Sequence, residues 1–185
     1  MPRIHLGDKG TTQINKAPNR ASKGSSLIYF YSQIDILNAH LNICLNLAKN
    51  QNNNNKIKKQ TINLIKQTIE ILEVLIKINS SIVASFFCLQ NRIDKKLPNK
   101  MLNTAKKLED KYVAHDFIWI YSNKLASYIN LARTYARATE NAYYQIKNNP
   151  LVNHSVDDTD IKVFLNRQST ILFHLAVGLE NQVYE

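Results

Sequence analysis

The sequence predicts an all-α protein of the four-helix-bundle type, with two long helices and a basic N-terminal arm. Glycine and proline are scarce beyond residue 24, where only Gly178, Pro98 and Pro150 occur. A sheet protein would need many more residues suited to tight turns. Apolar residues also recur every three or four positions over long stretches, which is the helical period. With 44% hydrophobic and 21% charged residues, the 185-residue chain can bury a sizeable core.

Residues 1–24 are predicted to form the arm, and residues 25–185 the helical bundle. Glycines, prolines and short polar residues in the arm argue against regular structure. Two interpretations stay open: a flexible terminus, or an extension that becomes ordered on a nucleic acid or a neighbouring subunit. Five basic residues face a single acid, Asp8, in this segment: Arg3, Lys9, Lys16, Arg20 and Lys23.

The first two helices are expected over residues 27–49 and 57–96, separated by an asparagine-rich loop. Ser25 or Ser26 can cap the first helix. The second helix has two apolar stripes, a wider apolar face than an ordinary bundle helix needs. It is therefore either enclosed by its own bundle or also faces another subunit. The polar residues 79–81 mark a kink or a break, and the pattern does not decide which.

A long central helix is predicted over residues 111–147, because this stretch contains neither proline nor glycine and keeps a helical apolar period. Residues 101–108 have the same period, so Pro98 can open one helix that continues to Lys147. A last helix is expected over residues 160–182. Asp157, Asp158 or Thr159 can cap it, since acids are favourable at the positive end of a helix.

The net charge of +10 is uneven, with a positive front and an acidic back, which suggests either an anionic partner for the front or head-to-tail self-association. Lys56, Lys58 and Lys59 lie at the expected start of the second helix, where the helix dipole disfavours cations. An external phosphate would explain this cluster. Arg133 and Arg137 are four residues apart on the exposed face of the central helix and can also hold phosphate, although Glu140 is placed to pair with Arg137 locally.

Several kinds of site are not found in the sequence. It has no glycine-rich phosphate loop, no GxSxG and no CxxC. Cys44 and Cys88 lie in apolar helical patterns and are interpreted as buried thiols, so we predict no metal site and no cofactor. No signal peptide or transmembrane run is visible. We therefore expect a soluble protein without membrane insertion, located inside a cell or within a particle.

Arg167 and His174 are separated by six residues (RQSTILFH), which places both side chains on one helix face. This Arg-x4–6-His spacing resembles the HEPN family of helical-bundle ribonucleases. The resemblance implies a pair acting on RNA at a dimer interface. Gln168 stands where that family usually has Asn or Asp, and the residues that follow it resemble a helix core.

The sequence-based hypothesis is a non-enzymatic helical assembly protein with no catalytic residue. It would bind RNA or DNA mainly through phosphate contacts, within a homo-oligomer or a larger ribonucleoprotein, virion-like or filamentous complex. Two alternatives are a protein–protein scaffold subunit without nucleic acid and a HEPN-like ribonuclease. The predicted nucleic-acid contacts are Arg3, Lys9, Lys16, Arg20, Lys23, Lys56, Lys58, Lys59, Arg133 and Arg137.

Overall fold

Five helices make up most of the computed structural model, which describes residues 9–13, 20–52, 59–86, 96–113, 120–146 and 158–184. The all-α prediction is therefore confirmed. The helices are α1 (Ser26–Asn52), α2 (Lys59–Phe86), α3 (Lys96–Lys111), α4 (Lys124–Ile146) and α5 (Asp158–Tyr184).

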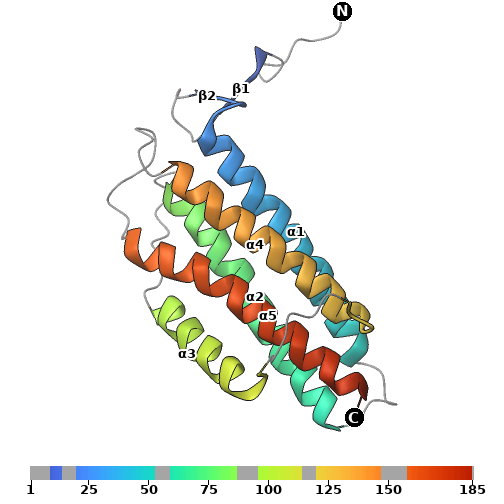
Figure 1. Ribbon diagram of the computed structural model, residues 1–185. Helices are drawn as coiled ribbons and strands as arrows, with labels where there is room; N and C mark the ends of the chain where they lie inside the picture. The colour runs from blue at the N-terminus through green and yellow to red at the C-terminus, as the bar shows by residue number, and fades with distance from the viewer. Residues whose placement is uncertain are drawn as a thin grey trace, which may run out of the picture.

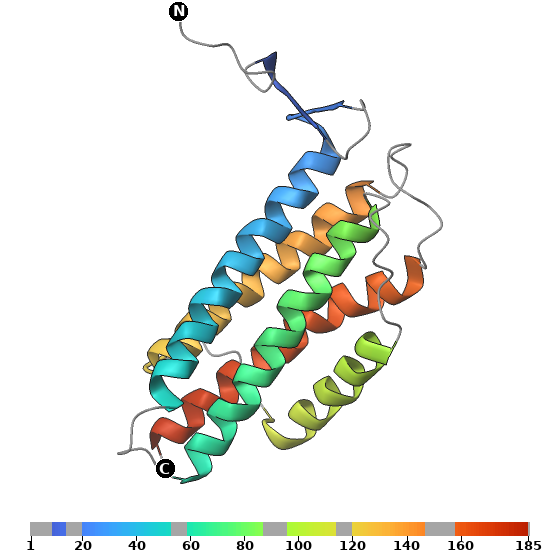
Figure 2. The ribbon, with the colours of Figure 1, turned by 180° about the vertical axis from the view of Figure 1, so that it is seen from behind.

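Four of the helices form a ring around one core (Figures 1 and 2). α1 packs against α2 and α4, and α5 packs against α4 and α2. α3 lies outside this ring, mainly on α5. Each helix buries one apolar stripe, as its period requires. Examples of fully buried core side chains are Phe30, Leu41, Leu72, Leu125 and Leu172.

α2 is continuous through residues 79–81, so the structure has no break at these positions. The Ser80 and Ser81 hydroxyls donate to carbonyls one turn earlier in the helix. The Asn79 amide donates to Asn38 Oδ1 of α1 over 3.1 Å. The wide apolar face of α2 is covered within the chain by α1, α5 and α3. Among the described residues, no exposed large apolar side chain lies on α2. The apolar face of α2 therefore gives no reason to expect a second subunit at this helix.

The predicted single helix over residues 111–147 is wrong. α3 ends at Lys111 and α4 begins at Lys124, and the described residues between them are not helical. Asn123 caps α4, because its Oδ1 accepts hydrogen bonds from the N–H groups of Leu125 (2.9 Å) and Ala126 (3.2 Å). The apolar period continues across the boundary between α3 and α4, so periodicity alone did not indicate that Asn123 caps a new helix.

A short antiparallel hairpin precedes α1 and lies at the end of the bundle where α1 begins (Figure 1). It pairs β1 (Thr11–Gln13) with β2 (Arg20–Ser22), in the register Thr12↔Ala21. The sequence analysis expected irregular structure in residues 1–24 and did not predict this hairpin. Arg20 joins the strands, because its guanidinium donates to both the hydroxyl and the carbonyl of Thr11 at 2.9 Å. No described helix is long and apolar enough to cross a membrane.

Candidate active site

Arg133 and Arg137 lie one turn apart on α4, on the side next to α5. Four residues correspond to about one helical turn, so both guanidinium groups project from the same face. Arg137 is exposed, as expected, but Arg133 is only 9% exposed, so the prediction that it lies on the exposed face is wrong. We call these two residues the arginine pair. A buried cation beside a second cation is unfavourable unless an anion compensates both charges.

Arg133 is held in place by residues of both helices. Its Nε donates to Asn130 Oδ1 over 2.8 Å, and its guanidinium carbon lies 6.0 Å from the ring centre of Phe173 on α5. Burial lowers the pKa of Arg133, the neighbouring Tyr121 phenol raises this pKa, and the charge on Arg137 lowers it. The group remains a cation, as arginine does in proteins, but it is poorly hydrated. Such a guanidinium favours binding of an anionic ligand.

Arg137 does not pair with Glu140, the acid that the sequence analysis placed beside it. Glu140 Oε1 instead accepts a hydrogen bond from Asn166 Nδ2 of α5 over 3.1 Å. Among the residues that the structure describes, Arg137 forms no hydrogen bond or ion pair. Its five N–H groups are thus available to a ligand.

The start of α4 is tied to the end of α5 below the arginine pair. The Glu180 carboxylate accepts hydrogen bonds from the backbone N–H groups of Ser122 (2.8 Å) and Asn123 (2.9 Å). In return, the Asn123 side-chain amide donates to the Leu179 carbonyl over 3.3 Å. Tyr121, which precedes these residues, interacts electrostatically with both Arg133 and Glu180.

This arrangement provides charge stabilisation for an anion. Two guanidinium groups on one helix face match the oxygens of a phosphate chain or a carboxylate, and one of them is already oriented by Asn130 and Phe173. Among the described residues, no three His, Cys, Asp or Glu side chains are grouped so that they could hold a metal ion.

The other predicted phosphate contacts are distributed over the chain. Lys9, Arg20 and Lys23 lie in or next to the hairpin, at one end of the bundle. Lys59 starts α2 at the opposite end. The structure thus brings together Arg133 and Arg137 and separates them from Lys59. Arg3, Lys16, Lys56 and Lys58 lie outside the described residues. These positions do not by themselves test whether any of the ten residues binds a phosphate.

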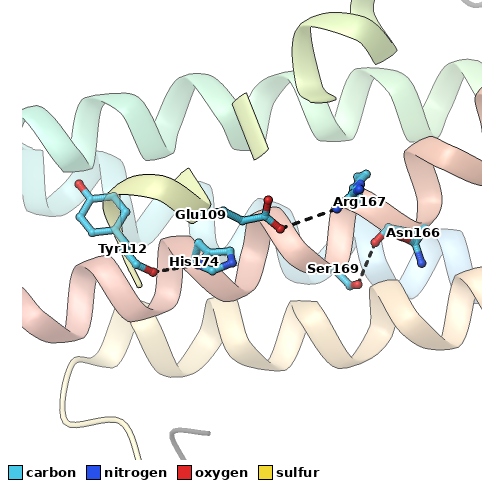
Figure 3. A network of polar contacts seen from close by, with 6 residues as sticks. All are labelled: Glu109, Tyr112, Asn166, Arg167, Ser169 and His174. Carbon is cyan, nitrogen blue, oxygen red and sulfur yellow. Dashed lines mark hydrogen bonds and ion pairs between the residues drawn. The ribbon is translucent and has the colours of Figure 1, made fainter. Parts of the chain in front are cut away.

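Arg167 and His174 do share one face of α5, but this face is covered by α3 and the residue that follows it (Figure 3). Arg167 Nη1 lies 3.7 Å from Glu109 Oε1 of α3. His174 Nδ1 lies 2.9 Å from the Tyr112 carbonyl oxygen, so this nitrogen carries the proton and donates. Both side chains therefore dock α3 onto the bundle.

The sequence did not single out Tyr121, Asn130, Phe173 or Glu180. Phe173 has the apolar period of its helix, and Tyr121 and Asn130 have no motif around them. Glu180 carried one available signal, because an acid in the last turns of a helix opposes the helix dipole. Such a residue needs a partner elsewhere in the fold.

Comparison with known proteins identifies related sequences and structures. A family model described as cobalamin adenosyltransferase matches residues 4–179. The fold is similar to that of a variant PduO-type ATP:co(I)rrinoid adenosyltransferase from Lactobacillus reuteri complexed with ATP, with a TM-score of 0.69 and 20% identity. That alignment covers 97% of this chain and 93% of the other. No curated protein matches the sequence.

A second similar structure is another variant of the Lactobacillus reuteri PduO-type ATP:corrinoid adenosyltransferase, complexed with cobalamin and ATP. Its TM-score is 0.69 and its identity 19%, with 98% of this chain and 93% of that chain covered. A third, also with cobalamin and ATP, has a TM-score of 0.66 and 18% identity, and the alignment covers 97% and 93% of the two chains.

These findings correct the functional hypothesis drawn from the sequence. The family-model match is to an enzyme family, so the non-enzymatic, structural, nucleic-acid-binding interpretation is wrong, and so is nucleic acid as the expected partner. The scaffold alternative is wrong for the same reason, and the HEPN-like ribonuclease alternative is wrong because the matched enzyme family is a different one, cobalamin adenosyltransferase. Net positive charge indicated an anionic partner in general and did not distinguish a polymer from a small phosphate compound.

Proposed function

Because the chain belongs to the cobalamin adenosyltransferase family, we propose that it transfers the adenosyl group of ATP to a corrinoid. In this reaction the two-electron cobalt(I) nucleophile of the corrinoid substrate forms a bond to the 5′ carbon of the ATP ribose. The bond between that carbon and its oxygen breaks. The oxygen keeps the bonding electron pair and leaves as part of inorganic triphosphate.

The arginine pair is the observation that supports this function within the structure. Triphosphate is a chain of anionic oxygens, and two guanidinium groups one helical turn apart can each contact a different phosphate. Arg133 is buried and oriented, whereas Arg137 is exposed and has no partner among the described residues. The first would fix the register of the phosphate chain, and the second would add charge from the solvent side.

The same two residues also suit the chemical step. Negative charge increases on the leaving triphosphate oxygen as the carbon–oxygen bond breaks. A guanidinium that is already held by Asn130 and Phe173 requires little reorganisation to stabilise that charge. We therefore assign the arginine pair to binding of ATP phosphates and to stabilisation of the leaving group.

A turnover assay tests this function. Purified protein is incubated with ATP and a corrinoid reduced to the cobalt(I) state, and the products are separated by chromatography. We expect an adenosylated corrinoid and inorganic triphosphate in equal amounts, both dependent on the protein. Absence of both products, with folded protein and fully reduced corrinoid, would rule out the proposed activity.

A further inference from the structure

Phe173 lies on α5 between the arginine pair and His174. The Arg133 guanidinium is over its ring, with 6.0 Å between the guanidinium carbon and the ring centre. This distance is within the range in which the negative face of an aromatic ring attracts a cation. The ring is half-buried. The position of the Phe173 ring therefore limits the orientations that the Arg133 side chain can take.

His174 packs against the same ring and also contacts the end of α3. The centres of the His174 and Phe173 rings are 5.2 Å apart and their planes meet at 75°, which is an edge-to-face arrangement. His174 Nδ1 donates to the Tyr112 carbonyl oxygen over 2.9 Å (Figure 3). The carbonyl thus fixes the orientation of the imidazole, and the imidazole supports the Phe173 ring.

A continuous series of contacts therefore runs from the end of α3, across α5, to α4. Both α3 and α4 pack against α5, which lies between them (Figure 3). The series passes from the Tyr112 carbonyl to the His174 ring, then to the Phe173 ring, and ends at the Arg133 guanidinium. On the α4 side, Asn130 Oδ1 accepts a hydrogen bond from Arg133 Nε over 2.8 Å. The guanidinium is thus held at one edge by α4 and over its face by α5.

We propose that His174 and Phe173 are positioning residues for Arg133, and that they raise the affinity of the enzyme for the phosphates of ATP. This inference rests on the proposed function. His174 holds the Phe173 ring in place, and the ring holds the plane of the guanidinium. Arg133 then meets a phosphate oxygen with little further loss of side-chain freedom, which lowers the entropic cost of binding. The end of α3 thus contributes to the arginine pair from the opposite side of α5.

The test uses His174→Asn and Phe173→Leu, alone and combined, and measures kcat, KM for ATP and the dissociation constant of inorganic triphosphate. The amide nitrogen of asparagine is bonded to Cγ, as Nδ1 of histidine is, so it can still donate to the Tyr112 carbonyl. The imidazole ring that supports Phe173 is lost. Leucine at position 173 keeps an apolar side chain and removes the aromatic face under the guanidinium.

Both substitutions should weaken binding of the phosphates. We expect Phe173→Leu to raise KM for ATP and the triphosphate dissociation constant about three- to fivefold, the effect of losing a cation–π contact. His174→Asn should raise both about threefold, because the Phe173 ring loses its edge-to-face neighbour. The value of kcat should change less than about twofold, since Arg133 still reaches the phosphate once ATP is bound. The double variant should bind triphosphate no more weakly than Phe173→Leu alone, because His174 acts through the Phe173 ring.

Arg167→Gln is the matched control, because Arg167 also docks α3 but lies earlier on α5. Its contact with α3 is the 3.7 Å ion pair with Glu109. This substitution should leave KM for ATP and the triphosphate dissociation constant within about twofold of wild type. Equal weakening by Arg167→Gln and His174→Asn would overturn the proposal, since docking of α3 in general would then be the cause. If His174→Asn does not fold, His174→Gln takes its place, because it also has an amide donor and no ring.

Failure of this inference is distinguishable from failure of the proposed function. If wild type binds ATP and triphosphate but Phe173→Leu and His174→Asn bind them equally well, positioning is overturned and the function stands. Unchanged triphosphate affinity in Phe173→Leu overturns positioning on its own. Positioning through the ring is also overturned if the effects of the two substitutions multiply in the double variant. If wild type binds neither ATP nor triphosphate, both proposals are overturned.

Discussion

The ring of Tyr112 lies against the backbone of α5 at Gly178, where three of its carbon atoms are 3.0 Å from the position that a Cβ would occupy. Tyr112 follows α3 directly, and its carbonyl accepts a hydrogen bond from His174. The absence of a side chain at residue 178 therefore lets the end of α3 approach α5 closely. Together with the ion pair between Glu109 and Arg167, this contact docks α3 outside the four-helix ring.

Replacing Gly178 with alanine should destabilise the protein. The added Cβ would displace the Tyr112 ring at an overpacking cost of about 1–3 kcal/mol, which exceeds the gain of about 0.5–1 kcal/mol from alanine in a helix interior. Urea unfolding should thus show a net loss of about 1 kcal/mol. Gly24→Ala is the control, because its nearest neighbour would be 3.8 Å away. Equal stability of wild type and Gly178→Ala would contradict the close contact.

Gln168 lies in the core of the bundle without exposure, and neither of its side-chain polar atoms has a hydrogen-bond partner among the described residues. Replacing it with methionine, which is similar in length and unbranched, should stabilise the fold by about 1–3 kcal/mol, because no buried polar group is left unpaired. Urea unfolding measures this, with exposed Gln145→Met as the matched control. A destabilised Gln168→Met would show that the amide has a compensating partner.

Cys44 provides a prediction about pH. Burial raises the pKa of Cys44 to about 12, while a backbone hydrogen bond lowers it. The folded protein therefore holds the thiol proton more tightly than the unfolded chain. The contribution of this group to stability is complete below the unfolded pKa and is lost as pH rises toward the folded pKa. The free energy of unfolding should fall above about pH 9, more steeply in wild type than in Cys44→Ala. Equal slopes would contradict the shift.

The helical architecture was predictable because apolar periodicity depends on local spacing. α1 and α5 lie close to their expected ranges for this reason. The division between α3 and α4 was not predictable from periodicity, since it depends on Asn123 and on a carboxylate 57 residues later in the chain. A cap that is completed by a distant residue has no local sequence signature.

The candidate site was predictable only in part. Arg133 and Arg137 could be recognised as a basic pair from their spacing, and the structure places them on one face of α4. The burial of Arg133 and the diversion of Glu140 to Asn166 depend on α5, which is distant in sequence. The predicted binding partner, nucleic acid, was wrong for a physical reason. Phosphates of a polymer and of a nucleotide attract the same side chains, so basic residues alone do not distinguish between them.

The most direct measurement compares kcat/KM for ATP in adenosyl transfer between Arg137→Gln and Arg167→Gln. Both arginines are exposed on helices, but Arg137 belongs to the arginine pair and Arg167 faces Glu109. If Arg137 binds ATP phosphates, its substitution should lower kcat/KM about 10- to 100-fold, the effect of losing a charged hydrogen bond. Arg167→Gln should change it less than about twofold, since an exposed ion pair contributes little. Equal activity of Arg137→Gln and wild type would contradict the placement of ATP at the arginine pair.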